Sequence, residues 1–387
     1  MKPSGPRLLT THAGSLPRPA ELVALHASAS RGEPVDADLL ARASEQATQR
    51  CVDRQLACGI DVGNDGEQGR ESFFTYVRTR MSGFGGQSQR PLMSDLARFP
   101  GFLALALPHY ARTSVSLMNA PKAIGPVRYA DPAPLAAELA RFERARSAAE
   151  VGRFAEAFWT APSPGIIACA MQNEHYPSLG DYVDALADAL RPEYEAVAAA
   201  GHVLQIDAPD LAMERHTLFA ERPLGEFLGF VERVLAALNR ALANVAPERV
   251  RLHVCWGNYE GPHVFDVPLP ELLPLLYGAR VGGLVLSMAN PRHAHEHKAL
   301  ARHPLPAGWL LAAGVIDTTT NYVEHPEVVA DRIELAARAV GDPRRVLAGT
   351  DCGFDTSAGL GQVAEDVVWE KLRALRAGAD LAAARLF

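Results

Sequence analysis

Residues 251–263 read Arg-Leu-His-Val-Cys-Trp-Gly-Asn-Tyr-Glu-Gly-Pro-His, and the fold is predicted outward from this stretch. Residues 251–255 predict a short buried strand, which ends where Trp256 and Gly257 turn the chain into a loop. Side chains two apart on a strand point to the same face, about 7 Å apart, so His253 and Cys255 face the same way. An imidazole and a thiol at a strand end suit a soft divalent metal such as zinc. The alternative is a buried cysteine beside a hydrogen-bonded histidine.

A similar pattern follows at residues 345–354, Arg-Val-Leu-Ala-Gly-Thr-Asp-Cys-Gly-Phe, where a buried strand is followed directly by Cys352. Apolar segments of this kind recur, each with a polar tip and then a helical stretch. The predicted strands are 8–13, 60–65, 165–171, 203–207, 251–255, 283–289, 310–316 and 346–350, and clear amphipathic helices cover 181–200, 224–245 and 326–340. Eight strands alternating with helices predict an α/β protein, a (β/α)8 TIM barrel that forms a single catalytic domain over residues 1–387.

Residues 72–164 do not fit this spacing. They are interpreted as an insertion between the second and third strands, carrying a hairpin and a helix over 134–148. A further strand over 113–118 is an alternative.

Composition and charge narrow the class of protein. The chain has 387 residues, 48% of them hydrophobic, and a net charge of −7. No basic surface for nucleic acid is indicated, no apolar run reaches membrane-spanning length, and the start does not resemble a signal peptide. The five cysteines lack the spacing of a disulfide framework, and Cys51, Cys58 and Cys169 are interpreted as core residues. A reduced, cytoplasmic enzyme acting on small molecules is expected, with no nucleic-acid or membrane partner.

A barrel places its reactive groups where strands end and loops begin. Polar residues follow every predicted strand, in the segments 12–15, 64–67, 172–176, 207–210, 253–255, 287–290, 317–321 and 351–352. The sequence therefore predicts one site built from these tips.

The tips carry motifs that resemble the catalytic barrel of the cobalamin-independent methionine synthase family. They are Thr-Thr-His-Ala-Gly-Ser-Leu-Pro-Arg at 10–18, Asn-Asp-Gly-Glu at 64–67, Gln-Ile-Asp-Ala-Pro at 205–209, His-x-Cys at 253–255, Ala-Asn-Pro-Arg-His at 289–293 and Asp-Cys-Gly at 351–353. The match also resembles short members of the family, which include epoxyalkane:coenzyme M transferase. The resemblance implies a Zn²⁺ ion held by His253, Cys255 and Cys352. It also implies an amino-acid thiol held by Ser15, Glu67 and Asp207.

Three departures from the family pattern concern the metal and the methyl donor. Ser287 stands where the synthases supply a glutamate ligand, and Thr318 follows Asp317 where they have a histidine. The indole that packs on folate has no counterpart near residues 172–176. The departures leave zinc-thiol chemistry in place and weigh against methylfolate as donor.

Further residues are assigned roles by their chemistry. Asp317, His293 and Tyr176 are predicted to act in catalysis, with His293, Tyr176 or Tyr322 as proton donor, and Asn290 to bind substrate. Glu67 and Asp207 would bind an ammonium group and Ser15 a carboxylate; backbone anchoring of loops is the alternative for each. A sulfonate thiol would require a guanidinium, with Arg18, Arg70 and Arg292 as candidates. The run 293–297, His-Ala-His-Glu-His, is interpreted as a helix start with His293 facing the pocket and His297 solvated, rather than as a second metal site.

The predicted function is a zinc-dependent transferase that moves a methyl or alkyl group onto a metal-activated thiol of the homocysteine type. A free thiol has a pKa of about 8.5 and is deprotonated when bound to the ion. The alternatives are a thiol–epoxide alkyltransferase or lyase like epoxyalkane:coenzyme M transferase, a metal-free enzyme of the uroporphyrinogen decarboxylase type, and a non-catalytic zinc or thiol-binding protein. The sequence makes no prediction about the oligomeric state.

Overall fold

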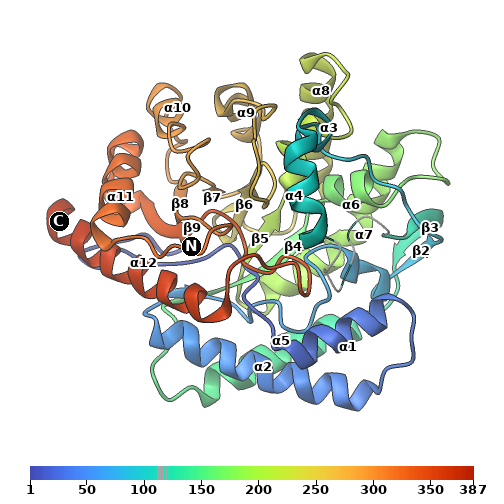
Figure 1. Cartoon of the computed structure of the whole chain (residues 1–387), viewed down its shortest axis with the longest axis horizontal. Coiled ribbons are helices and arrows are strands. Elements are labelled where there is room, and N and C mark those ends of the chain that lie inside the picture. Colours follow the sequence, from blue (N-terminus) through green and yellow to red (C-terminus); the bar gives the residue numbers. More distant parts are fainter. Residues whose placement is uncertain (111–114, 116, 118–119) are drawn as a thin grey trace.

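Seven parallel strands form one curled sheet in the middle of the molecule, and helices cover its outside (Figure 1). The computed structural model describes residues 1–110, 115, 117 and 120–387. Within these residues the sheet order is β1-β4-β5-β6-β7-β8-β9. The strands are β1 (Val62–Gly63), β4 (Glu156–Pro162), β5 (Val203–Asp207), β6 (Val250–Val254), β7 (Gly283–Leu286), β8 (Leu310–Ile316) and β9 (Val346–Thr350).

Helices connect the strands and pack on the sheet, so the strands are buried on both faces, as is usual for parallel sheets. The α-helices are α1 (Ala20–Ser30), α2 (Ala37–Ala57), α3 (Ser94–Arg98), α4 (Pro100–Tyr110), α5 (Ala133–Ala148), α6 (Pro164–Ala170), α7 (Leu179–Ala199), α8 (Leu224–Ala241), α9 (Leu269–Leu276), α10 (His297–Arg302), α11 (Pro326–Val340) and α12 (Glu365–Leu386). Short 3-10 helices are η1 (Thr75–Thr79), η2 (Pro209–Leu211), η3 (Met213–His216), η4 (Pro247–Arg249) and η5 (Pro343–Arg345). No helix of the described chain is long and apolar enough to cross a membrane.

The first predicted strand, 8–13, lies between the two edges of the sheet and contacts both. Thr10 forms a parallel bridge with Ala348 of β9, and Thr11 forms one with Val62 of β1. The Thr11 N–H donates to the Ala348 carbonyl over 2.8 Å, and the Val62 N–H donates to the Thr10 carbonyl over 2.9 Å. The observed architecture is a curled seven-stranded sheet with single bridges at its edges.

The third predicted strand, 165–171, is wrong, because these residues form helix α6. Ser163 caps the helix by accepting the Ile166 N–H over 3.0 Å, and Pro164 occupies the first turn, where its missing N–H has no cost. A short apolar run does not distinguish a buried strand from a buried helix by periodicity. The strand at this place in the sheet is β4, which the predicted insertion 72–164 had included.

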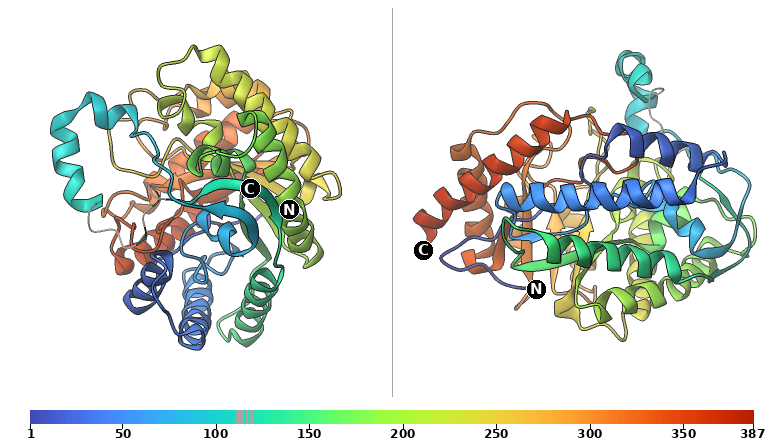
Figure 2. Two further views of the ribbon diagram at one scale, coloured as in Figure 1. Left: turned by 90° about the vertical axis from the view of Figure 1, so that its right-hand side faces the viewer. Right: turned by 90° about the horizontal axis from the view of Figure 1, so that it is seen from below.

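The remaining part of that insertion agrees with the prediction in outline. Strands β2 (Met81–Gly85) and β3 (Lys122–Tyr129) pair antiparallel, and α5 occupies the predicted helix at 134–148. Helices α3 and α4 lie between β2 and β3 in the sequence, and α4 projects from the body of the molecule (Figure 2). The alternative strand over 113–118 falls mostly outside the described residues.

Candidate functional site

A cavity of about 440 Å³ opens at the carboxyl ends of the strands. Six residues predicted from the sequence line it together: Ser15, Glu67, Asp207, His253, Cys255 and Cys352. The register of β5 against β6 pairs Asp207 with His253, which brings these two side chains together. The outer wall of the cavity is largely apolar and includes Leu92, Met93, Leu96, Leu103, Val115 and Leu117.

His253, Cys255 and Cys352 form a group of potential metal ligands, with ligand atoms that all lie within 4.8 Å of one another. His253 lies in β6, Cys255 follows that strand directly, and Cys352 lies two residues beyond β9. The Nδ1 atom of His253 donates to Asp207 over 2.9 Å, and the imidazole also hydrogen-bonds to Cys255. Zinc is commonly held by neutral histidine nitrogen and cysteine sulfur, so these three donors fit the ion.

The charges of this group depend on one another. Burial disfavours a charged imidazole, but the hydrogen bonds to Asp207 and Cys255 raise the pKa of His253 to about 10. The hydrogen bond from Cys352 lowers the pKa of Cys255 well below its usual range and raises that of Cys352. One thiolate is therefore already favoured before any cation is considered.

Asp207 orients His253 and is itself held by residues from the sheet interior. Gln205 donates from Nε2 to Asp207 over 2.6 Å and accepts from Arg251 Nε over 2.8 Å. Such outer contacts fix the tautomer and direction of a ligating histidine. Gln205 and Asp207 are two residues apart on β5, so their side chains share a face. This spacing is visible in the sequence, although no role was predicted for Gln205.

Glu67 is held in the cavity by a strained loop. Its φ is +57°, unusual for a residue other than glycine, and its Oε1 atom accepts from Thr160 over 2.9 Å. Burial and the neighbouring Asp207 carboxylate raise the pKa of Glu67 to about 7. The buried Oε2 atom has no partner, which leaves it available for a cationic group of a ligand. Thr160 was missed because β4 was not predicted.

A smaller cavity of about 20 Å³ lies on the other side of Cys255 and Cys352. It is lined by four more predicted residues, Ser287, Asn290, His293 and Asp317. Ser287 donates to the Asp351 carbonyl over 2.7 Å. The Asn290 side chain accepts the Arg292 N–H over 2.9 Å, and Asp317 accepts the N–H groups of its own loop. Asp351, to which no role was assigned, accepts the N–H groups of residues 288–290 and so fixes this loop.

Other candidates lie elsewhere. The Tyr176 hydroxyl accepts the Val127 N–H over 2.7 Å, and its ring stacks on Tyr182. It is not among the described residues that line either cavity. Arg18 and Arg70 are buried in ion pairs with Asp355 and Glu138. Arg292 donates to the His263 carbonyl. The structure therefore does not bring these side chains to the group formed by His253, Cys255 and Cys352, hereafter the thiol site.

The fold and the site define a class of protein: a parallel α/β protein with a histidine and two cysteines at the carboxyl end of its sheet. No protein-family model matches the chain. In sequence, the chain is 26% identical to methionine synthase of Sulfurisphaera tokodaii, over 90% of this chain and 86% of the relative. It is 26% identical to 2-hydroxypropyl-CoM lyase of Xanthobacter autotrophicus, over 56% of this chain and 59% of the relative.

In structure, the chain is similar to the B12-independent methionine synthase of Shewanella sp. W3-18-1, solved with selenomethionine. The TM-score is 0.74 at 22% identity, and the match covers 98% of this chain and 99% of the other. The resemblance inferred from the motifs is confirmed by these similarities.

Proposed function

We propose that this chain is a zinc-dependent transferase that moves a methyl or alkyl group onto the thiol of an amino acid of the homocysteine type. The observation that carries the proposal is one cavity lined by a His-Cys-Cys donor group and by two carboxylates, Glu67 and Asp207. We also propose that residues 8–13 act as the eighth strand of a (β/α)8 barrel and that residues 1–387 form one catalytic domain.

Zinc would be held by His253, Cys255 and Cys352, and would supply the Lewis acidity that lowers the pKa of a substrate thiol. Three protein ligands leave a tetrahedral position for that sulfur. Asp207 keeps the Nδ1 proton of His253, so that Nε2 offers its lone pair toward the cysteines. Position 287 supplies no acidic ligand, because it is a serine whose hydroxyl donates to the Asp351 carbonyl.

The carboxylates favour an amino-acid thiol. Glu67 has a free buried oxygen beside Asp207, and an ammonium group placed there relieves the repulsion between two buried acids. Ser15 lines the same cavity and is the proposed partner of the substrate carboxylate. A sulfonate thiol is the second candidate, favoured by the similarity to the CoM lyase. Arg90 lines the cavity, but its guanidinium is ion-paired with Glu214.

The apolar outer wall favours a small or apolar donor. Methylfolate requires a proton at its departing nitrogen, and the threonines after Asp317 do not supply one near neutral pH. For an epoxide donor, whose ring strain lowers the barrier to opening, His293 at the small cavity is the proposed proton donor, with Asp317 and Asn290 holding its surrounding loops. A metal-free decarboxylase or a simple binding protein accounts less well for three converging metal donors.

The first experiment measures zinc and thiol binding. Zinc content near one per chain is expected at the thiol site, and Cys352→Ser should lose it. In the cobalt-substituted protein, homocysteine should change the thiolate-to-metal absorption band. Glu67→Gln should weaken homocysteine binding by about tenfold, the scale of one lost charged contact, and leave 2-mercaptoethanol unchanged. Retention of zinc at this site by Cys352→Ser would overturn the ligand set.

The second experiment compares donors with homocysteine as acceptor. Methyltetrahydrofolate should give little turnover, whereas a small methylsulfonium donor should give more. Epoxypropane with 2-mercaptoethanesulfonate tests the lyase alternative. Robust methionine formation from methyltetrahydrofolate by the purified chain would contradict the proposed donor class.

A further inference from the structure

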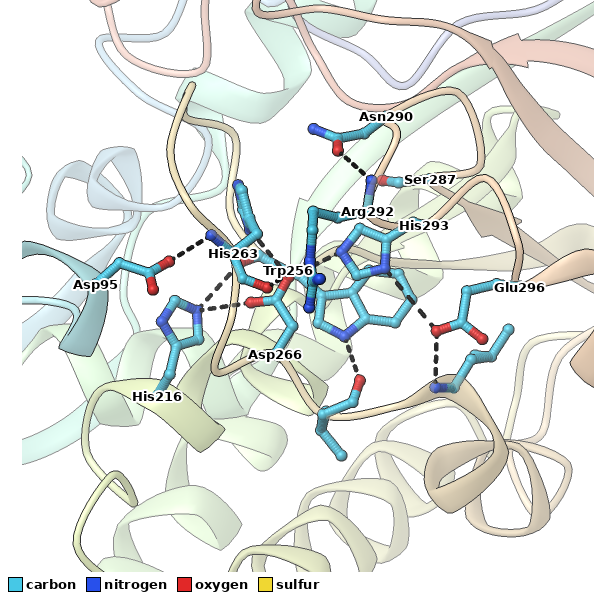
Figure 3. Close-up of polar contacts among 12 residues, drawn as sticks. Asp95, His216, Trp256, His263, Asp266, Ser287, Asn290, Arg292, His293 and Glu296 are labelled. Atoms are coloured by element: carbon cyan, nitrogen blue, oxygen red, sulfur yellow. Dashed lines mark hydrogen bonds and ion pairs between the residues drawn. The ribbon is translucent and has the colours of Figure 1, made fainter. Parts of the chain in front are cut away.

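A second group of potential metal ligands lies behind the thiol site and contains no sulfur. It consists of His263, Asp266 and His293, with ligand atoms that lie within 4.8 Å of one another (Figure 3). All three side chains are buried, with exposures of 3%, 3% and 6%. His263 and Asp266 belong to the loop after β6, and His293 to the loop after β7.

The separations suit ligands of one ion. The Oδ2 atom of Asp266 lies 2.9 Å from His263 Nδ1 and 2.8 Å from His293 Nε2. Ligand atoms at right angles around an ion, each about 2.1 Å from it, are about 3 Å apart. The same separations also fit two N–H donors on one carboxylate, so the outer nitrogens of the histidines decide between the two arrangements.

Those outer nitrogens face acceptors. His263 Nε2 lies 3.0 Å from the Tyr259 carbonyl, an oxygen that only accepts, so Nε2 carries a proton. His293 Nδ1 has no hydrogen-bond partner and lies 3.9 Å from Glu296 Oε1. The His263 contact matches the way in which metal-ligating histidines commonly donate their second N–H to a carbonyl oxygen. With the protons on the outer nitrogens, both ring lone pairs face the Asp266 carboxylate and a cation between them removes the repulsion; with the protons on the inner nitrogens, both rings donate to Asp266 without a metal. Metal binding by the purified protein distinguishes these two states.

The surrounding charges also favour a cation. Asp95, Asp266 and Glu296 are three buried carboxylates around the two rings. The buried Oδ1 atoms of Asp95 and Asp266 have no hydrogen-bond partner. The nearby Arg292 is exposed and donates to a backbone carbonyl, so it does not neutralise the group directly.

We propose that His263, Asp266 and His293 bind a second divalent transition-metal ion, separate from the thiol site. Two imidazoles and one carboxylate suit Zn²⁺ or Fe²⁺ rather than Ca²⁺ or Mg²⁺. His216 Nε2 lies 3.5 Å from Asp266 Oδ1 but hydrogen-bonds to the Trp256 carbonyl, so that carboxylate oxygen stays unpartnered. The small cavity is lined by Cys255 and Cys352 as well as by His263 and His293, so the two sites are neighbours. The inference does not rest on the zinc-thiol part of the proposed function. It gives His293 a metal-binding role in place of the proton transfer proposed above, because both nitrogens of a metal-bound imidazole are engaged.

The test removes both cysteines of the thiol site and measures the zinc that the second site still binds. The variant Cys255→Ser/Cys352→Ser, saturated with Zn²⁺ and desalted, should retain about one zinc per chain. Adding His293→Phe should remove it, because phenylalanine keeps the stack on Trp256, at 4.0 Å, but lacks nitrogen. Adding His295→Ala is the matched control, since that histidine is 61% exposed and outside the group. Asp266→Asn is a second, isosteric variant, and thermal unfolding shows that each variant is folded.

Cobalt titration of the unaltered protein distinguishes the two sites. One equivalent should produce a thiolate-to-metal band, and another should add ligand-field absorption without increasing that band. A double cysteine variant that binds no zinc, or zinc retained after both His293→Phe and Asp266→Asn, would overturn the inference and leave the thiol site intact. Zinc bound by the double variant alone, with no thiolate band in the unaltered protein, would instead contradict the proposed function.

Discussion

At the residue scale, Ser287 occupies a position where a carboxylate would add an acidic ligand to the proposed zinc site. Its hydroxyl is bonded to the Asp351 carbonyl, and its side chain lines the small cavity beside Cys255 and Cys352. Ser287→Glu should bind zinc at this site at least about tenfold more tightly, the scale of changes around a metal. Competition with a chelator measures this, in a His293→Phe background that isolates the site. Glutamine has the size of glutamate without its charge, so Ser287→Gln should not tighten zinc binding. Equal zinc affinities of the Ser287→Glu and Ser287→Gln variants would show that position 287 does not reach the metal.

Glu67 predicts a pH dependence of stability. Its pKa rises from a usual 4.5 to about 7 on folding, because of burial and Asp207. The folded state therefore holds this proton more tightly, and the stability it contributes is complete below pH 4.5 and is lost as the pH rises through 7. Glu67→Gln keeps a neutral group at every pH. In the ligand-free protein it should lie within about 1 kcal/mol of the unaltered chain at pH 5 and exceed it by about 2–3 kcal/mol at pH 8.

Urea unfolding at pH 5, 6, 7 and 8 measures this difference. The exposed Glu221→Gln should show no such trend. A constant difference between Glu67→Gln and the unaltered protein across this range would contradict the raised pKa.

At the scale of one element, Ser163 stabilises the first turn of helix α6. Ser163 caps the helix through the Ile166 N–H and also donates to the buried Asp210, whose pKa burial raises to about 7. Ser163→Ala should cost about 1 kcal/mol for the cap and about 1–2 kcal/mol more for the unsatisfied carboxyl group. The exposed cap Ser178 of α7 provides the comparison, and Ser178→Ala should cost about 1 kcal/mol alone. Equal losses in urea unfolding would show that Asp210 does not depend on Ser163.

At the scale of the whole molecule, Arg251 joins the sheet to the segment that bridges its edges. From β6 its guanidinium donates to Gln205, to the Thr11 hydroxyl over 3.1 Å and to the His12 carbonyl over 3.0 Å. It also lies 3.9 Å from the centre of the Phe158 ring. Arg251→Met leaves three buried acceptors without this donor and should cost about 2–4 kcal/mol.

Arg249→Met, two residues earlier, is the control. Its guanidinium makes a 3.4 Å contact near the surface, so the cost should stay within about 0.5 kcal/mol. A similar small loss for Arg251→Met would show that the interior contacts do not hold the edge segment in place.

The sequence by itself determined the parallel α/β class and placed the proposed zinc ligands at strand ends. Short apolar segments such as β6 and β9 are specified locally, because a buried parallel strand reads as a continuous apolar run with a polar tip. That His253, Cys255 and Cys352 converge follows from the rule that the carboxyl ends of such strands meet, while their assignment as one ligand set came from the family resemblance. The same logic placed Ser15, Glu67 and Asp207 at one cavity.

Tertiary structure decided what local pattern could not. Residues 164–170 form a helix that Ser163 caps at the Ile166 N–H while it donates to Asp210. Tyr176 lies away from the cavities because β4, not residues 165–171, supplies the strand at this place in the sheet. The grouping of His263, Asp266 and His293 arises from two loops whose approach depends on Trp256 packing beneath His293. Strand periodicity specifies which face a side chain occupies, but loop contacts are set by long-range packing, and packing is not encoded in any single stretch of the chain.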